Sequence, residues 1–154
     1  MSRFTIVSLT ALMIAGLAAG LAVPARADLS GTVLHFIGQR TAAAQLDLGP
    51  AGGSLGDQVV FTGLLLDTQR RQVGHFEGVL TALDADGNRN QAQVTLALAA
   101  GQIAVQGELD FTAPQPFVHA VTGGTGRYAD TGGMFSFRNT DQAGVIDITL
   151  DLRR

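Results

Sequence analysis

The sequence of 154 residues contains no cysteine, no tryptophan and no lysine, and its ten basic residues are all arginine. The absence of cysteine excludes a disulfide scaffold, a thiolate nucleophile and a cysteine-ligated zinc site. Charged residues make up only 15% of the chain and the net charge is −3, which argues against a nucleic-acid-binding protein, since such proteins carry clustered positive charge. The hydrophobic content of 46% is too high for a disordered chain.

The first 27 residues have the pattern of a secretory signal peptide. Arg3 supplies a positive start, the stretch Phe4–Val23 carries no charge, Pro24 breaks any helix, and Ala25-Arg26-Ala27 fits the small-x-small cleavage rule. The alternative is an uncleaved transmembrane anchor, because about 20 apolar residues can span a bilayer. We predict a cleaved leader over residues 1–27.

Cleavage leaves one domain over residues 28–154 with a net charge of −5, since Arg3 and Arg26 are lost with the leader and no acidic residue is. Its length is that of a single domain. We expect a secreted or periplasmic protein without membrane anchoring once the leader is removed.

After the leader, apolar residues recur with period 2 between Gly, Asp and Asn, which is typical of short strands. Eight strands are predicted, over Thr32–Ile37, Gln58–Leu66, Val73–Leu83, Gln91–Ala99, Gln102–Phe111, Phe117–Thr122, Gly133–Asn139 and Val145–Leu152. The last is the clearest, because its Ile and Leu residues alternate with Asp and Thr, as in a strand with one buried face.

Short turns join these strands, so the fold is all-β and antiparallel. Asp86-Gly87-Asn88 and Ala100-Gly101 are tight turn signals, and Asp67–Gln72 is a polar turn. Eight such strands form either a sandwich or a closed barrel, and periodicity alone does not choose between them. The Ala- and Gly-rich segment Gln39–Leu55 is predicted to be a mobile loop or rim.

Few residues can carry chemistry. His75 and Glu77 share one face of a strand, but a metal site needs three or four converging ligands, so we favour a solvated pair. Asp84–Asn88 lacks the final Glu of a calcium loop and is interpreted as a turn. Gly123–Gly126 has no following Lys-Ser/Thr, so it is a strand connection rather than a phosphate loop.

Three blocks of the sequence together resemble the allene oxide cyclases, their bacterial relatives and the plant dirigent proteins. The first runs from Gly56 through Asp67 to Gly78, the second is Gln102–Gly107, and the third runs from Ala120 to Gly133. The resemblance implies an eight-stranded antiparallel barrel with an apolar cavity, commonly a homotrimer, that works without a cofactor or metal.

The resemblance also implies site residues. Phe61 matches a cavity-lining Phe of the family and Leu80 matches a cavity Cys of the plant enzymes, while the key cavity acid falls at His35. By parity, the predicted ligand-binding residues are Val33, Ile37, Val59, Phe61, Leu65, Phe76 and Leu80. A His in an apolar cavity has a lowered pKa and can act as a neutral base, so His35 is the candidate catalytic residue. The alternative is a structural histidine that is hydrogen-bonded to a backbone carbonyl.

Three functions fit these expectations. The first is a barrel that binds a small hydrophobic molecule. The second is a cofactor-independent cyclase or isomerase, or a dirigent-like protein, that holds a flexible substrate in a reactive conformation, with Arg138 or Asp57 as rim partners of His35. The third is a structural module, since a fold does not fix a function.

Overall fold

A computed structural model describes residues 31–153, and the expected leader over residues 1–27 lies outside this range. The strands are β1 (Thr32–Leu46), β2 (Gln58–Leu66), β3 (Gln72–Ala82), β4 (Arg89–Leu98), β5 (Gly101–Asp110), β6 (Phe117–Gly124), β7 (Gly132–Asn139) and β8 (Val145–Arg153). A short 3-10 helix, η1 (Gly126–Tyr128), precedes β7. No helix in this part of the chain has the length and apolar character needed to cross a bilayer.

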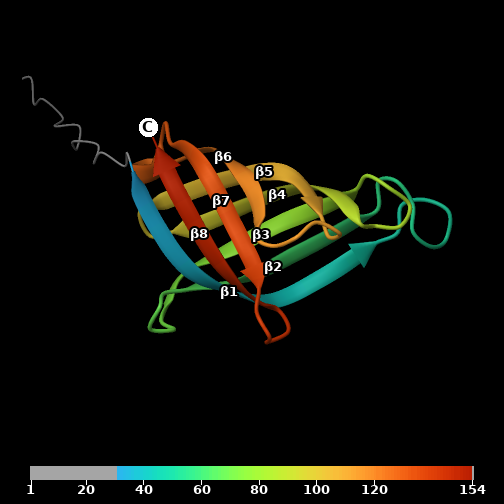
Figure 1. Ribbon diagram of the computed structural model, residues 1–154, viewed down its shortest axis with the longest axis horizontal. Helices are drawn as coiled ribbons and strands as arrows, with labels where there is room; N and C mark the ends of the chain where they lie inside the picture. The colour runs from blue at the N-terminus through green and yellow to red at the C-terminus, as the bar shows by residue number, and fades with distance from the viewer. Residues whose placement is uncertain (1–30, 154) are drawn as a thin grey trace, which may run out of the picture.

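The eight strands form a closed antiparallel barrel in chain order. Each strand pairs with its neighbour in sequence, and β8 closes the ring by pairing with β1 from Gln39 and Val145 to Thr32 and Leu152. Figure 1 shows β8 between β1 and β7 at this closure. The barrel, and not the sandwich, is therefore the fold, and closure leaves no free strand edge along these pairings.

The inward and outward faces follow the predicted alternation on most strands. On β8, Ile148, Leu150 and Leu152 are buried, as the period-2 pattern predicts. On β3, Phe76 and Ala82 are buried while His75 and Glu77 are exposed. The solvated interpretation of the His75–Glu77 pair is thereby confirmed.

Strand β1 is longer than predicted, and the expected loop over Gln39–Leu55 is wrong in its first half. The strand continues to Leu46 by pairing with β2, in register from Ala42 opposite Thr62 to Leu46 opposite Gln58. A bulge between Arg40 and Ala42 shifts this register. The Ala-rich segment has no alternation of its own, so its strand conformation comes from backbone pairing with β2 and not from side-chain pattern.

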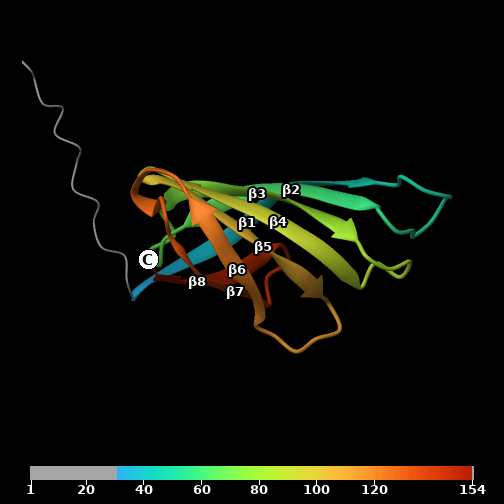
Figure 2. The same ribbon diagram turned by 90° about the horizontal axis from the view of Figure 1, so that it is seen from above.

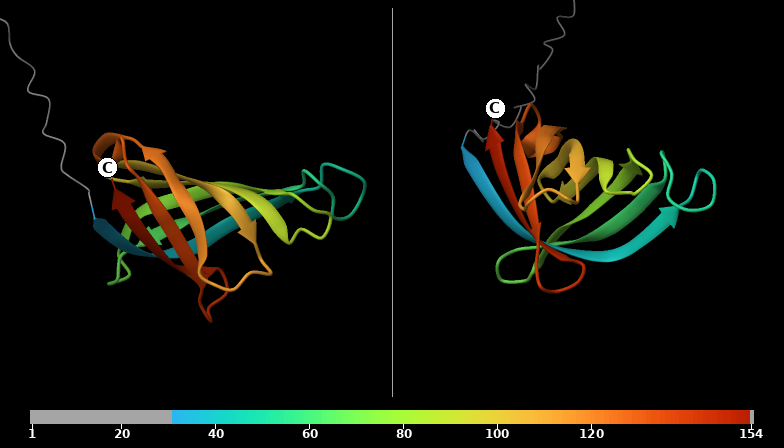
Figure 3. Two further views of the ribbon diagram at one scale, coloured as in Figure 1. Left: turned by 45° about the horizontal axis from the view of Figure 1, so that its top comes forward. Right: turned by 45° about the vertical axis from the view of Figure 1, so that its right-hand side comes forward.

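The two ends of the barrel differ. At one end, here called the filled end, Leu65, Leu96, Ile103, Leu150 and Leu152 are completely or almost completely buried. At the other, here called the cavity end, the second half of β1 and the neighbouring part of β2 extend away from β6, β7 and β8 (Figures 2 and 3). The interior of an eight-stranded barrel holds side chains or one small ligand, and the second possibility arises at the cavity end.

Candidate functional site

A partly open cavity of about 150 Å³ lies inside the barrel toward the cavity end. Its apolar lining consists of Phe61, Phe76, Leu80, Ala92, Val94, Leu96, Val105, Leu109, Phe111, Phe135, Phe137, Ile146 and Ile148. Among the described residues that line it, the polar side chains are Arg40 and His119. An apolar space with very few polar groups is the usual form of a small-molecule site.

His119, from β6, is built into the wall of this cavity. Its side chain is only 5% exposed, and neither ring nitrogen has a hydrogen-bond partner within residues 31–153. A neutral imidazole has one N–H donor and one acceptor nitrogen. An unpaired buried donor or acceptor costs about 1–3 kcal/mol, so His119 carries a hydrogen-bonding capacity that the protein itself leaves unused.

The ring of His119 is held by its neighbours. It stacks on Phe137 at an interplanar angle of 12° with 5.9 Å between ring centroids, and it lies 6.1 Å from Phe135. On β5, Gly107 leaves room for it, since a Cβ there would lie 2.6 Å from His119 Cδ2. Burial in this apolar wall lowers the pKa of the His119 imidazole from its ordinary value of 6.5, so the ring is neutral at neutral pH.

Arg40 and Phe111 stand at the mouth of the cavity, where both are exposed. The β1 bulge begins at Arg40, and its backbone N–H donates to the carbonyl of Gly144 at 2.8 Å. Within residues 31–153, no carboxylate forms an ion pair with the Arg40 guanidinium. The mouth therefore carries a positive charge, and the interior carries none at neutral pH.

Three of the predicted ligand-binding residues, Phe61, Phe76 and Leu80, line the cavity. Phe61 and Phe76 lie 6.1 Å apart between ring centroids. Val59 lines a neighbouring hollow instead. Leu65 faces inward but is fully buried at the filled end.

The structure corrects the expected positions of Val33, His35 and Ile37. All three lie on the outer face, because their partners in the β1–β8 register are the outward residues Asp151, Thr149 and Asp147. Val33 is 51% exposed.

His35 is exposed, and its Nδ1 lies 3.2 Å from Thr149 Oγ1. It borders an external groove with Ile37 and Arg138. The inward positions of β1 are Leu34 and Phe36, which pack against the core. Both faces of this strand are apolar in sequence and no glycine motif anchors it, so its parity is fixed by pairing with β8 and β2 and not by its own pattern.

His119, the buried histidine of the cavity, is not among the site residues that the sequence predicts. The sequence Phe117-Val118-His119-Ala120-Val121 has an apolar residue on each face and does not choose between them. In the structure Phe117 and Val121 are buried with His119, and Val118 is exposed. Phe117 could have indicated the position of His119. Residues two apart in a strand share a face, and Phe117 is a large aromatic residue that favours the interior.

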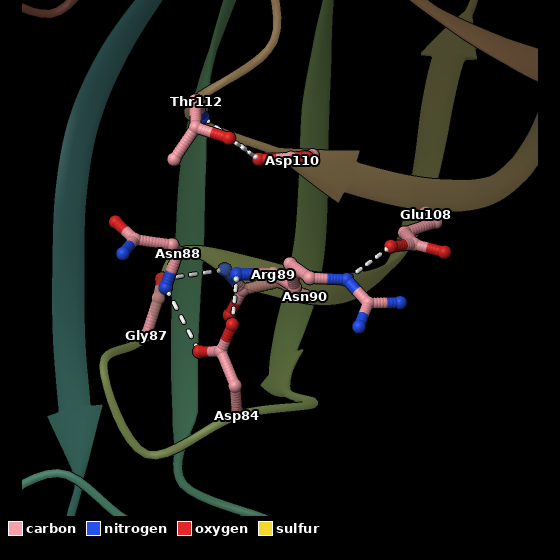
Figure 4. A network of polar contacts seen from close by, with 8 residues as sticks. All are labelled: Asp84, Gly87, Asn88, Arg89, Asn90, Glu108, Asp110 and Thr112. Atoms are coloured by element: carbon pink, nitrogen blue, oxygen red, sulfur yellow. Dashed lines mark hydrogen bonds and ion pairs between the residues drawn. The ribbon is translucent and has the colours of Figure 1, made fainter.

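A second hollow of about 300 Å³ adjoins the cavity and shares Leu80 and Phe111 with it. Asp57, Asp84 and Asp86 border it. Figure 4 shows the Asp84 carboxylate accepting hydrogen bonds from the backbone N–H groups of Asn88 and Arg89, at 3.0 and 3.2 Å. The Asp84–Asn88 segment is thus the turn that the sequence predicted.

The fold and site define a class: a closed eight-stranded barrel with an apolar internal cavity. The chain belongs to the allene oxide cyclase barrel-like family, whose domain model matches residues 37–150. The resemblance seen in the sequence is thereby confirmed. Among curated proteins the search found no match.

Several solved structures are similar to this barrel. Pyocyanin demethylase is 26% identical with a TM-score of 0.67, and the match covers 78% of this chain and 98% of that one. A pterocarpan synthase dirigent protein is 15% identical with a TM-score of 0.65, covering 84% and 93%. A Diels-Alderase from Streptomyces koyangensis is 18% identical with a TM-score of 0.65, covering 82% of this chain and 66% of that one. The last two likenesses, at such low identity, concern the fold alone.

Proposed function

We propose that this protein binds a small hydrophobic molecule, with an apolar ring seated in the cavity at the cavity end. The observation that carries the proposal is a space of about 150 Å³ whose wall is almost wholly aromatic and aliphatic. An apolar cavity of about this volume in another protein stays dry and binds benzene. A larger ligand would place one ring here and extend past Arg40 through the mouth.

Titration with toluene, followed by the NMR shifts of the cavity methyl and Phe resonances, tests this proposal. The matched variants are Ala92→Leu, which adds three carbon atoms inside the cavity, and Ala104→Leu, which adds the same atoms on the exposed face of β5. We expect toluene to bind the parent protein and Ala104→Leu, and to lose at least about tenfold in affinity with Ala92→Leu. Toluene that fails to bind, or that binds all three proteins equally, would overturn the proposal.

A second candidate is a cofactor-independent cyclase or isomerase that fixes the conformation of a flexible substrate. The observation that favours it is His119, a buried residue of the cavity wall whose two ring nitrogens have no hydrogen-bond partner within residues 31–153. An imidazole can accept or donate a proton in catalysis.

Isomerisation keeps mass constant, and this gives the test. The protein is incubated with a small-molecule extract of its source and the mixture is analysed by liquid chromatography and mass spectrometry. Support would be a product with the mass of its precursor and a new retention time, formed by the parent protein and not by His119→Phe. Identical profiles for the two proteins would remove this candidate.

We further propose that the protein is exported and assembles as a homotrimer. Export rests on the leader pattern of residues 1–27, and the trimer on the family resemblance. Fractionation of the source cells and light scattering of the purified protein test the two statements separately.

A further inference from the structure

Among the residues that the structure describes, one arginine belongs to the lining of the cavity, Arg40 of β1. Its direction follows from the register of the barrel. Arg40 pairs with Gly63 of β2, and a Cβ on Gly63 would collide with the ring of Phe76, a residue of the cavity wall. Residues directly opposite each other on paired strands share a face. Arg40 therefore starts from the inner face of β1, at the mouth where its side chain is exposed.

The side chain of Arg40 lies beside the β7–β8 turn and not against an acid. Its backbone N–H donates to the carbonyl of Gly144 at 2.8 Å, and a Cβ on Gly144 would lie 4.0 Å from Arg40 Nε. Asp141 belongs to the same turn, yet within residues 31–153 it forms no ion pair with Arg40. A guanidinium stays charged at neutral pH and carries several N–H donors in a planar fork. This charge and these donors remain available to a molecule that extends out of the cavity.

We propose that Arg40 determines the charge specificity of the cavity, selecting a ligand that combines an apolar ring with one acidic group on a short linker. This inference rests on the proposed binding function, in which the ring occupies the cavity. The volume of about 150 Å³ admits one ring, and the aromatic wall favours a planar one. A polar group of the ligand then lies at the mouth, where the guanidinium can pair with a carboxylate through parallel N–H···O bonds.

The position of the positive charge decides which ligands gain affinity. A carboxylate enclosed in the apolar interior would lose its hydration without a partner, which is strongly unfavourable. At the mouth the carboxylate stays partly hydrated while it contacts Arg40, so the pair adds a modest free energy of binding. An ammonium group at the same place is repelled by the guanidinium. The result is a preference among ligands that carry the same ring.

The experiment compares 4-phenylbutyrate, 4-phenylbutanol and 4-phenylbutylamine, which share a phenyl ring and a carbon chain and differ in the charge at its end. Dissociation constants are measured by NMR titration at pH 7.5 and low salt for the parent protein, Arg40→Gln, Arg40→Lys and the control Arg138→Gln. Arg138 is exposed on the outer face of β7, opposite Asp147, so the control removes an equal charge outside the cavity.

We expect the parent protein to bind the carboxylate best and the amine worst. The preference for the carboxylate over the alcohol should fall about fivefold in Arg40→Gln, persist in part in Arg40→Lys and stay unchanged in Arg138→Gln. High salt should reduce the preference in the parent protein. A preference that is the same in Arg40→Gln as in the parent, or that falls equally in Arg138→Gln, would overturn the inference.

Ala92→Leu tests whether the ring of the anion occupies the cavity. Because this variant fills the space that the ring needs, it should weaken 4-phenylbutyrate as it weakens toluene. An affinity for 4-phenylbutyrate that Ala92→Leu leaves unchanged would mean that the anion binds on the surface, and would overturn the inference.

A measurement on the unmodified protein covers the case in which a variant does not fold. The Nε–H resonance of Arg40 should move on adding 4-phenylbutyrate and stay in place on adding 4-phenylbutanol, and shifts of equal size would also overturn the inference. If toluene binds and the three phenylbutyl ligands bind equally well, the role of Arg40 is refuted alone. Failure of toluene to bind refutes the binding function and the charge specificity with it.

Discussion

At the scale of single residues, the fit of His119 in the cavity wall depends on the absence of a side chain at Gly107 of β5. A Cβ on Gly107 would lie 2.6 Å from His119 Cδ2 and 3.2 Å from two further atoms of that side chain. Gly107→Ala should therefore displace the imidazole and lower the free energy of unfolding by about 1–3 kcal/mol, as overpacking does.

Urea denaturation measures this loss, and Gly132→Ala is the matched control. A Cβ on Gly132 would find its nearest neighbour at 3.8 Å, so this variant should remain within about 0.5 kcal/mol of the parent. Equal effects at the two positions would show that the close approach of Gly107 to His119 does not matter.

The buried histidine also makes stability depend on pH. Because burial lowers the pKa of His119 in the folded protein, the unfolded chain takes up a proton at a pH where the folded protein does not. Stability is therefore lost as the pH falls below the unfolded value of about 6.5, by up to about 1.4 kcal/mol per pH unit, until the folded pKa is reached.

The measurement is the free energy of unfolding at pH 8, 7, 6 and 5 for the parent protein and for His119→Gln. The difference between the two proteins isolates this group from all others that titrate. We expect the parent to lose more stability than His119→Gln between pH 7 and 5; parallel curves would contradict the assignment.

The two histidines show what sequence can and cannot assign at this scale. Phe61, Phe76 and Leu80 could be placed in the cavity because glycine-containing blocks fix the register of β2 and β3. On β1, either Leu34 and Phe36 or Val33 and Ile37 could face the interior by sequence, and pairing with the neighbouring strands decides between them. His35 was therefore placed on the wrong face, and His119 was missed for the same reason, since β6 carries an apolar residue on both of its faces.

At the scale of elements, the connection from β1 to β2 is organised by one carboxylate. Asp57 accepts hydrogen bonds from the backbone N–H of Leu48 and of Ser54 and from the Ser54 hydroxyl, at 3.0, 2.8 and 2.9 Å. These bonds, first those from the backbone of Leu48 and Ser54, lower the pKa of Asp57 below its ordinary value of 3.8. The carboxylate therefore orders this connection at neutral pH, and its contribution is lost as the pH falls through the lowered value.

Asp57→Asn should loosen this connection while leaving the barrel folded. Amide hydrogen exchange at Leu48 and Ser54 should become faster, because an amide side chain has one acceptor oxygen where the carboxylate has two. Asp47→Asn is the control, since Asp47 accepts one exposed bond from the Gly52 N–H at 3.2 Å. Unchanged exchange in Asp57→Asn would show that this segment is held by other contacts.

Most elements could be predicted from alternation and turn residues, because a barrel strand with a buried face and a wet face repeats every second residue. The second half of β1 could not, because its alanines and polar residues have no such repeat. Its conformation is imposed by β2, a partner distant in sequence, and a bulge at Arg40 and Ala42 adjusts the faces. The same bulge places Arg40 at the mouth of the cavity, which local sequence does not indicate.

At the scale of the whole molecule, the fully buried core lies at the filled end of the barrel and the open space lies at the cavity end. Leu150 is completely buried at the filled end, so Leu150→Ala should cost about 2–5 kcal/mol. Leu80 is half-buried and already borders open space in both the cavity and the adjoining hollow, so its truncation should cost less.

Leu80→Ala should also change what the barrel accepts. Leu80 lines both the cavity of about 150 Å³ and the hollow of about 300 Å³, and we expect the removal of three of its carbon atoms to join the two spaces. A ligand with two fused rings, such as naphthalene, should then gain at least about tenfold in affinity relative to toluene, since the added ring replaces water contact by apolar burial. Leu150→Ala, measured in the same titration, separates this effect from a general loosening, because it lowers stability without joining the two spaces. If naphthalene gains as much with Leu150→Ala as with Leu80→Ala, the extra binding comes from loosening; if it gains with neither, Leu80 is not the wall between the two spaces.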